Sequence, residues 1–141
     1  MKIFIAVLLI VHGLITAAQA GSSFRPSGGV ANPGWLAWWP TGLGQSWIWS
    51  SLGMEGSFLA RMGGLLWLAA GAALIAAGLA LLGVLVPAGW WRGLALAGAA
   101  LSLLMLAIYL HPFYAVGILS SVLVLISLLS RFELLSKIIP V

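Results

Sequence analysis

The chain consists mainly of long apolar stretches separated by short polar breaks. Four stretches lack Asp, Glu, Lys and Arg altogether, at residues 3–18, 63–86, 93–110 and 113–129. An α-helix of about 18 or more apolar residues is long enough to cross a hydrocarbon core roughly 30 Å thick. The pattern therefore predicts an all-α fold, in which residues 1–141 form one polytopic membrane domain with a bundle of four transmembrane helices. The predicted spans lie at about residues 3–20, 62–86, 91–110 and 113–130, and a long loop covers residues 21–61.

Small residues recur along the second and third predicted spans. The spacings are seven residues in one series and four in the others: Gly64, Gly71 and Gly78; Ala72, Ala76 and Ala80; Gly93 and Ala97; Gly98 and Ser102. Lipid tails are as apolar as leucine, so membrane helices associate where small residues let their backbones approach closely. We expect tight helix contacts at these faces, and the same faces are candidate contacts with other membrane subunits or a second copy of the chain.

Tryptophans dominate the second half of the long loop. Residues 21–33 are rich in Gly, Ser and Pro, which is typical of an irregular connector. Indole rings in residues 34–59 combine an apolar body with one N–H donor, and such rings settle at the lipid headgroup level. We predict that the loop lies at the membrane interface and contains a short helix near residues 45–52. The alternatives are that its tryptophans bind a lipid tail or a quinone, or that they form a docking surface for another subunit. The predicted interfacial aromatics are Trp35, Trp38, Trp39, Trp47, Trp49, Trp90 and Trp91.

Short breaks separate the last three spans. Pro87, Ala88 and Gly89 are expected to end the second helix and to start a tight hairpin. His111 and Pro112 interrupt the next apolar run, and a proline suits the first turn of a helix because its missing N–H has no partner there. After residue 129 the sequence becomes amphipathic and predicts an interfacial tail.

Composition and charge support a membrane address and exclude several functions. The chain is 63% hydrophobic and 6% charged, whereas soluble domains carry about 25% charged residues. The absence of cysteine excludes disulfides, thiolate catalysis and cysteine-ligated metals. The net charge of +4 is too dispersed for nucleic-acid binding and instead indicates topology.

We predict a multi-pass protein of the cell membrane, with both termini cytoplasmic and loop 21–61 outside. The inner side would hold Lys2, Arg92, Arg131 and Lys137, and the outer side Arg25 and Arg61.

The first apolar stretch has two interpretations. Lys2, the apolar run and the Ala-Gln-Ala sequence at residues 18–20 fit a cleaved signal peptide. A histidine is unusual inside the apolar core of a signal peptide, so His12 favours a retained first helix, which is the prediction that we adopt.

His12 is the clearest candidate for chemistry. It lies near the middle of the first span, where ionisable side chains are costly and often functional. Thr16 and Gln19 follow at i+4 and i+7, so the three side chains share one helix face that should point into the bundle. As a functional polar stripe, this face would be a quinone headgroup site, a proton relay or part of a metal site. As a structural feature, a neutral imidazole would hydrogen bond across helices and contribute about 0.6 kcal/mol, and we favour this interpretation.

A second candidate cluster lies on the outer face. Glu55 and Arg61 flank the entrance of the second helix, where a capping or surface salt-bridge role is favoured and proton transfer is the alternative. His111 could meet Glu55 or the tryptophan loop on the same face, although a plain turn residue is the favoured interpretation. The sequence contains no phosphate-binding glycine loop, no HExxH motif and no visible nucleophile–base spacing. We therefore predict no catalytic residue, no metal site and no cofactor, with a quinone as the alternative.

Several short motifs resemble those of small, uncharacterised bacterial four-helix membrane proteins. HGLI at residues 12–15 resembles their N-terminal HGLIH signature, and QSWI at 45–48 is similar to their loop motif. Further similar motifs are LWLA at 66–69, WWR at 90–92 and HP at 111–112. These proteins are similar to the DoxX-like class, some members of which are associated with respiratory quinone chemistry.

The resemblance implies a four-helix membrane fold but no established activity. Thr16 stands where the second histidine of the signature would be, and Ser120 and Ser121 occupy a region where an acidic residue is expected. A catalytic role that depends on those groups is therefore not implied for this chain.

Three functions remain open at the sequence level. We favour a non-enzymatic structural or accessory component of a membrane assembly, whose partners are the lipid bilayer and other membrane subunits or further copies of the chain. The alternatives are a DoxX-like quinone-linked oxidoreductase component and a small oligomeric transporter. His12 facing a polar-lined cavity connected to the loop would favour the quinone alternative, whereas His12 packed against a backbone carbonyl would favour the structural one.

Overall fold

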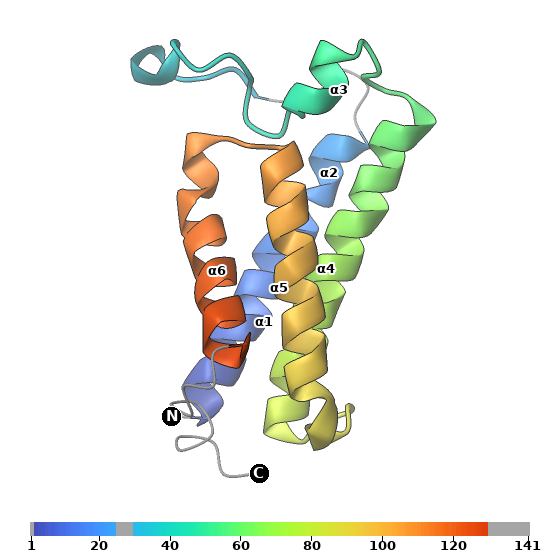
Figure 1. The fold of residues 1–141 in the computed structure, drawn as a ribbon, viewed down its shortest axis with the longest axis vertical. Helices are drawn as coiled ribbons and strands as arrows, with labels where there is room; N and C mark the ends of the chain where they lie inside the picture. The colour runs from blue at the N-terminus through green and yellow to red at the C-terminus, as the bar shows by residue number, and fades with distance from the viewer. Residues whose placement is uncertain (1, 25–29, 130–141) are drawn as a thin grey trace.

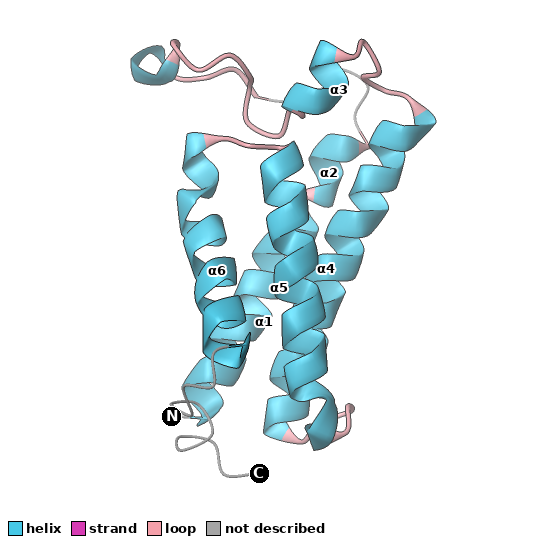
Figure 2. Cartoon of the chain, viewed as in Figure 1, coloured by secondary structure: helices cyan, strands magenta, loops and turns pink. Residues whose placement is uncertain are grey.

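The computed structural model describes residues 2–24 and 30–129, and in this part of the chain it contains helices and no β-strand (Figures 1 and 2). The elements are α1 (Lys2–Ala18), α2 (Ala20–Ser23), η1 (Gly34–Leu36), α3 (Trp47–Ser51), α4 (Phe58–Leu82), η2 (Ala88–Trp90), α5 (Trp91–Ile108), η3 (Pro112–Tyr114) and α6 (Ala115–Leu129). The all-α prediction is confirmed. The predicted tail after residue 129, with Arg131 and Lys137, and the placement of Arg25 lie outside the described residues.

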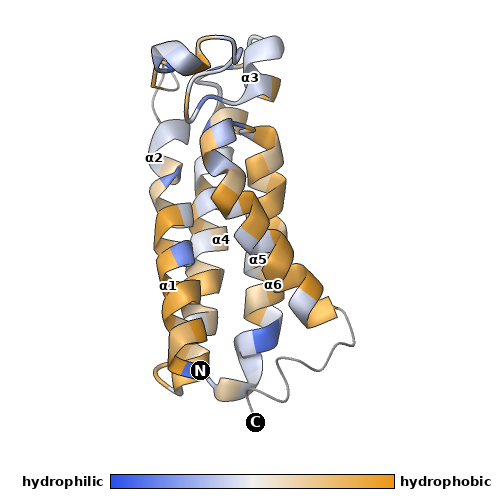
Figure 3. Ribbon diagram, turned by 90° about the vertical axis from the view of Figure 1, so that its left-hand side faces the viewer, coloured by the Kyte–Doolittle hydropathy of each residue, from blue (hydrophilic) through white to orange (hydrophobic). Residues whose placement is uncertain are grey.

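Four helical stretches are long and apolar enough to cross a membrane, as predicted. They are Lys2–Ser23, Phe58–Leu82, Ala88–Ile108 and Pro112–Leu129. Figure 3 shows hydrophobic residues along all four and paler colours over the segment around α3. In Figure 1, α3 and its flanking loops lie at one end of the bundle, which we call the loop end, and the α4–α5 connection lies at the other, the hairpin end. α1 begins and α6 finishes at the hairpin end.

The second span is shifted toward the loop compared with the sequence prediction. α4 begins at Phe58 because Ser57 caps it, its side chain accepting a hydrogen bond from the Ala60 N–H at 3.2 Å. It ends at Leu82 because Gly83 adopts a left-handed φ of 73°. The N–H groups of Gly83 and Val84 then bond to carbonyls of the last helical turn, as in a Schellman motif. The expectation that residues 87–89 end this helix was therefore wrong.

Glycines bring α1 and α4 into backbone contact. A Cβ atom built on Gly71 would lie 2.6 Å from the carbonyl oxygen of Gly13, and one on Gly13 would lie 2.7 Å from the oxygen of Gly71. A Cβ on Gly78 would lie 2.7 Å from the oxygen of Ala6. Only glycine fits at such separations, so the predicted close packing at Gly71 and Gly78 is confirmed, with α1 as the partner.

Only some of the other small residues lie at contacts between helices. Gly98 of α5 packs against Leu74 of α4, and Ser102 is also buried. Glycines seven residues apart stay on one helix face, because seven residues make almost two full turns. The remaining predicted positions are not all at a contact: Ala72, Gly93 and Ala97 are exposed.

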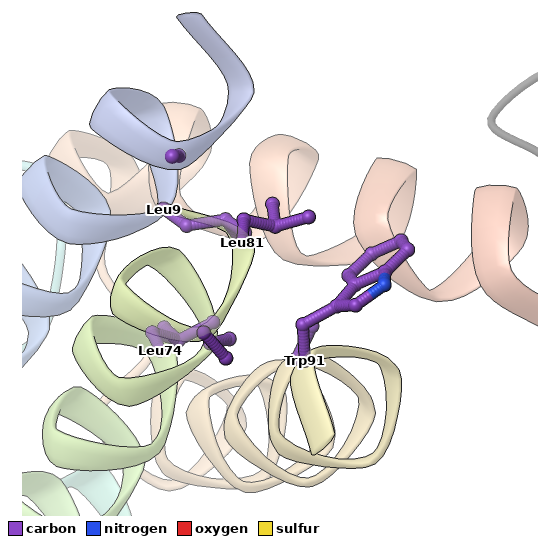
Figure 4. Close-up of a cluster of buried hydrophobic side chains, with 8 residues drawn as sticks. Leu9, Leu74, Leu81 and Trp91 are labelled. Carbon is purple, nitrogen blue, oxygen red and sulfur yellow. The ribbon is translucent and has the colours of Figure 1, made fainter. Parts of the chain in front are cut away.

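Two apolar clusters form the core. The cluster in the hairpin half contains Leu9, Leu74, Leu81 and Trp91, which meet between α1, α4 and α5 (Figure 4). The cluster in the loop half is built around Trp67 and Tyr109. Trp91 is 4% exposed, whereas the preceding Trp90 is 64% exposed. The interfacial position expected for both rings stays a prediction. Neighbouring residues point about 100° apart on a helix, so one indole enters the bundle and the other leaves it.

α6 is the least enclosed of the four spans. Its only fully buried residue is Ser121. Large apolar side chains along its outer face are exposed, namely Val116, Leu119, Leu123, Ile126 and Leu129. In Figure 1, α6 stands beside α5 and away from α4.

The glycine contact predicts the effect of a single methyl group. Gly71→Ala is expected to lower the free energy of unfolding by about 1–3 kcal/mol, because overpacking at a backbone contact forces the helices apart. Gly93→Ala is the matched control, since nothing lies within 4 Å of a Cβ there, and it should be neutral or slightly stabilising through helix propensity. Unfolding of both variants in detergent micelles, followed by circular dichroism, measures the difference. Equal stability of the two variants would contradict the contact.

Candidate functional site

A cavity of about 300 Å³ lies in the loop half of the bundle, mainly between α1, α5 and α6. Its volume is at the lower end of the range found for small-molecule sites, about 300–1,000 Å³. The polar residues that line it are His12, Thr16, Gln19, Ser102, Tyr114 and Ser120. Apolar or aromatic walls come from Ile15, Leu43, Trp67, Leu106, Phe113 and Val116. Leu43 belongs to the long loop, so the cavity extends from the helix midpoints to the loop end.

His12 joins α1 to α5 and α6 through a chain of hydrogen bonds. Its Nε2 lies 3.0 Å from the Ser121 hydroxyl, which donates in turn to Ser102 at 3.4 Å. Because Ser121 gives its one proton to Ser102, His12 donates to Ser121 through Nε2–H. Nδ1 lies 3.3 Å from the Ser120 hydroxyl, whose own proton goes to the Gly117 carbonyl at 3.0 Å. The imidazole is thus a partnered group at the edge of the cavity.

The predicted polar stripe is found on one side of the cavity. Thr16 is buried and donates to the His12 carbonyl at 2.8 Å, a bond within its own helix. Gln19 accepts a hydrogen bond from the Tyr114 hydroxyl at 2.9 Å, through its side-chain oxygen. That bond leaves the Gln19 amide N–H₂ as a donor group on the cavity wall. The sequence prediction that His12, Thr16 and Gln19 point into the bundle is confirmed.

Trp67 is a site residue that the sequence analysis did not select. Its ring is 1% exposed and packs edge-on against Tyr109, with ring centroids 5.8 Å apart. The indole Nε1 is buried and has no acceptor among the described residues, although the ring lines the cavity. A buried donor without a partner costs about 1–3 kcal/mol. Two signals in the sequence pointed to it: a large ring in a span otherwise rich in Gly and Ala, and its place in the LWLA motif at 66–69.

The tryptophan loop, residues 30–57, is fastened to the end of α5. The Trp47 indole donates to the Ala107 carbonyl at 2.7 Å, and the Ser46 hydroxyl donates to the Ile108 carbonyl at 3.1 Å. Carbonyls in the last turn of a helix have no partner within the helix. The loop therefore caps α5, and this attachment holds Leu43 over the cavity. The predicted short helix is also present, as α3.

His111 fixes the α5–α6 connection to the same loop. The side chain is 1% exposed, and its Nε2 lies 2.9 Å from the Asn32 side-chain oxygen. The Asn32 amide donates to the Trp39 and Thr41 carbonyls at 3.1 and 3.0 Å. The Phe113 N–H donates to Nδ1 at 3.3 Å, so Nε2 carries the proton. Burial disfavours the imidazolium ion and holds the pKa of His111 below its ordinary value.

The predicted cluster of Glu55, Arg61 and His111 does not form. Glu55 accepts hydrogen bonds from Gln45, at 2.8 Å, and from Ser50. These bonds, that from Ser50 foremost, hold the pKa of the carboxyl below its usual range. The predicted capping role falls to Ser57, Arg61 is exposed, and no hydrogen bond or ion pair within the described residues joins the three side chains.

The reason is the path of the backbone on either side of Glu55. Gly53 and Gly56 adopt left-handed φ values of 65° and 73° and turn the chain back, so the carboxylate reaches α3 rather than α4.

The remaining tryptophans differ in exposure. Trp35, Trp38, Trp47 and Trp90 are exposed, and Trp39 and Trp49 are partly buried. Exposed indoles at both ends of the bundle suit an anchoring role at the headgroups, which stays a prediction.

No group of three or more His, Cys, Asp or Glu side chains lies close enough to hold a metal ion in the described part of the chain. The fold and the cavity define the class: a four-helix membrane protein with a polar-lined internal cavity. No family model, no curated protein and no solved structure matches the chain. Its resemblance to the HGLIH-signature and DoxX-like proteins stays a prediction.

The environment of His111 predicts that attachment of the loop depends on pH. An unfolded or detached His111 has a pKa of about 6.5, and burial lowers it in the folded state. The loop is therefore fully held above about pH 6.5, and its attachment weakens as the pH falls below that value. Hydrogen–deuterium exchange, corrected for the intrinsic rates, should show less protection of residues 30–57 at pH 5.5 than at pH 7.5.

His111→Gln is the matched control, because it keeps a side chain capable of hydrogen bonding and removes the titration. Its exchange should not change between the two pH values. The same pH dependence in this variant and in the unsubstituted chain would assign the effect to another group.

Proposed function

We propose that this chain is an integral membrane protein that binds a lipid-soluble molecule with a compact, acceptor-bearing head, and that a quinone is the chemical class. The observation that carries the proposal is the unpartnered indole N–H of Trp67 beside a cavity that His12 also lines. A ligand carbonyl oxygen that reached this covered N–H would relieve the cost of the unpartnered donor.

The chemistry of the lining fits such a head. Donors predominate, because within residues 2–24 and 30–129 the Trp67 N–H and the Gln19 side-chain N–H₂ have no acceptor, and Ser120 can redirect its hydroxyl from the Gly117 carbonyl. A quinone ring carries two carbonyl oxygens and no donor, which matches a donor-rich pocket with apolar walls.

The walls also provide a route for a tail. Ile15 and Val116 both line the cavity, and they are 58% and 78% exposed on the surfaces of α1 and α6. An isoprenoid or alkyl tail would leave between these two helices into the bilayer. A head of this kind with a hydrocarbon tail therefore fits better than a water-soluble molecule.

The chain's own contribution would be binding and orientation. Trp67 and Gln19 would hold acceptor oxygens, Tyr114 fixes the Gln19 amide, and the loop excludes water from above through Leu43. A bound quinone would supply electron and proton transfer, for which a redox partner is needed. We therefore propose an accessory component of a membrane assembly, in line with the DoxX-like resemblance.

We also propose that both termini are cytoplasmic and that the tryptophan loop lies outside. Lys2 begins α1 and Arg92 is the second residue of α5, both at the hairpin end, whereas Arg61 lies in the first turn of α4 at the loop end. Basic residues accumulate on the cytoplasmic side of membrane proteins.

The absence of cysteine allows this orientation to be tested directly. Ser51→Cys in the exposed part of the loop and Ala88→Cys in the α4–α5 connection each introduce one thiol. In right-side-out vesicles, a membrane-impermeant maleimide should label the first variant, and it should label the second only after permeabilisation. The reverse pattern would invert the proposed topology.

The ligand is tested with a short-tailed benzoquinone and the purified full chain in neutral detergent. Isothermal titration should detect saturable binding, and Trp67→Phe should weaken it about tenfold, since it removes one hydrogen bond of roughly 1.4 kcal/mol. Trp38→Phe is the matched control, because that exposed ring lies away from the cavity and should leave affinity unchanged. Absence of binding, or equal affinity in the two variants, would refute the quinone proposal.

A structural role for His12 is the second candidate, and the use of both of its ring nitrogens by Ser120 and Ser121 favours it. If His12 has only this structural role, His12→Leu should lower the stability of the bundle. The unsubstituted chain should then bind no quinone.

A further inference from the structure

A second cavity, of about 150 Å³, lies in the hairpin half of the bundle. It is bounded by Ile5 and Leu9 of α1, Trp91 of α5, and Leu123 and Leu128 of α6. Ser127 is its one polar lining residue. Leu123 is exposed, so this wall reaches the outer surface between α1 and α6. The cavity is therefore an apolar groove that is open to the bilayer, and it suits a hydrocarbon chain.

A positive charge is fixed at one edge of this groove. The guanidinium carbon of Arg92 lies 5.5 Å from the centroid of the Trp91 ring, and that ring lines the groove. Figure 4 shows the same ring reaching from α5 toward α6. A cation–π contact of this kind restrains an otherwise mobile side chain, so the charge stays beside the groove.

Lys2 brings a second positive charge to the same end. It precedes Ile5 by three residues, so the two side chains share a face of α1. α1 and α5 both begin at the hairpin end (Figure 1), which places Lys2 and Arg92 at the same level of the bundle. Glu55, which carries the one carboxylate side chain in residues 2–24 and 30–129, lies at the loop end. Nothing described at the hairpin end neutralises these two charges.

We infer that the groove binds one acyl chain of an acidic phospholipid, whose phosphate is held by Arg92 and Lys2. The hydrocarbon chain would lie against Leu9, Leu123 and Leu128, below the level of the two cations. Basic pockets between membrane helices bind acidic headgroups, and each Lys or Arg near such a surface contributes about a fivefold gain in affinity. This inference uses the membrane setting only, and it does not depend on what occupies the larger cavity.

The experiment compares two lipids that differ in headgroup charge. The full chain, purified in neutral detergent, is mixed with phosphatidylglycerol or with phosphatidylcholine of identical acyl chains, and native mass spectrometry counts the adducts. One phosphatidylglycerol should be retained per chain in preference to phosphatidylcholine. Arg92→Gln should reduce its affinity about fivefold. Arg61→Gln removes the same charge at the loop end and should leave the affinity unchanged.

A groove-filling variant tests the apolar half of the site. Leu123→Trp keeps both cations and occupies the space of the acyl chain, so it should lower retention of phosphatidylglycerol severalfold. Unfolding of each variant in detergent confirms that the bundle remains intact, and the exposed position of residue 123 favours this result.

Four outcomes would overturn the inference. The first is equal retention of the two lipids, and the second is equal loss in Arg92→Gln and Arg61→Gln, which would indicate nonspecific attraction. The third is unchanged lipid binding in Leu123→Trp. The fourth is a dimer that Leu123→Trp dissociates, because the groove would then be a contact between copies of the chain. Trp67→Phe should not affect lipid retention, so failure of the quinone proposal is distinguishable from failure of this one.

Discussion

The structure depends on one constraint, which is that polar groups inside a hydrocarbon layer must find partners within the protein. His12 lies in the middle of a span, and Ser120 and Ser121 of α6 supply its partners. Ser102 of α5 accepts in turn from Ser121. Ser121 is the one fully buried residue of α6, so the hydrogen-bonded node of His12, Ser121 and Ser102 is the main polar attachment of that helix. At the loop end the same constraint explains why Trp47 and Ser46 cap the last carbonyls of α5.

Close packing on one side of the bundle creates space on the other. Gly13, Gly71 and Gly78 draw α1 onto α4 until their backbones touch, and Gly98 does the same for α5 and α4. α6 has only one glycine in its span, Gly117, and bulky residues keep it at a greater distance. The gap between α1 and α6 is then divided by the His12–Ser121 bond. The larger, polar-lined part lies toward the loop, and the smaller, apolar part lies toward the hairpin.

Features that depend on local periodicity could be predicted from the sequence. The four spans follow from hydropathy, and the shared face of His12, Thr16 and Gln19 follows from the helical repeat. Features that depend on helix rotation or on the path of a loop could not. Trp90 and Trp91 are adjacent and equally aromatic, and only the register of α5 decides which one is buried. The partners of His12 are 108 and 109 residues away, and no spacing rule relates them.

Glycines in turns decided the path of the chain at two places where a proline or a charged residue led to a different prediction. The sequence predicted that α4 ends at Pro87, because proline cannot continue a helix. Gly83 ends α4 earlier in the chain by adopting a left-handed conformation. Glu55 was expected at α4 on electrostatic grounds, but two glycines direct it to α3. In both cases a glycine at positive φ sets the direction of the chain. The contacts of Pro87 and of the Glu55 carboxylate then follow from that direction.

The two cavities give α6 a special place in the energetics of the fold. A molecule that binds only when α6 is docked stabilises that arrangement by RT ln(1 + [L]/Kd), and this term adds to the hydrogen bonds of the central node. Both cavities use α6 as a wall, so a ligand in either one favours the same docked position. The two parts of the space beside α6 are therefore closed on one side by the same weakly enclosed helix.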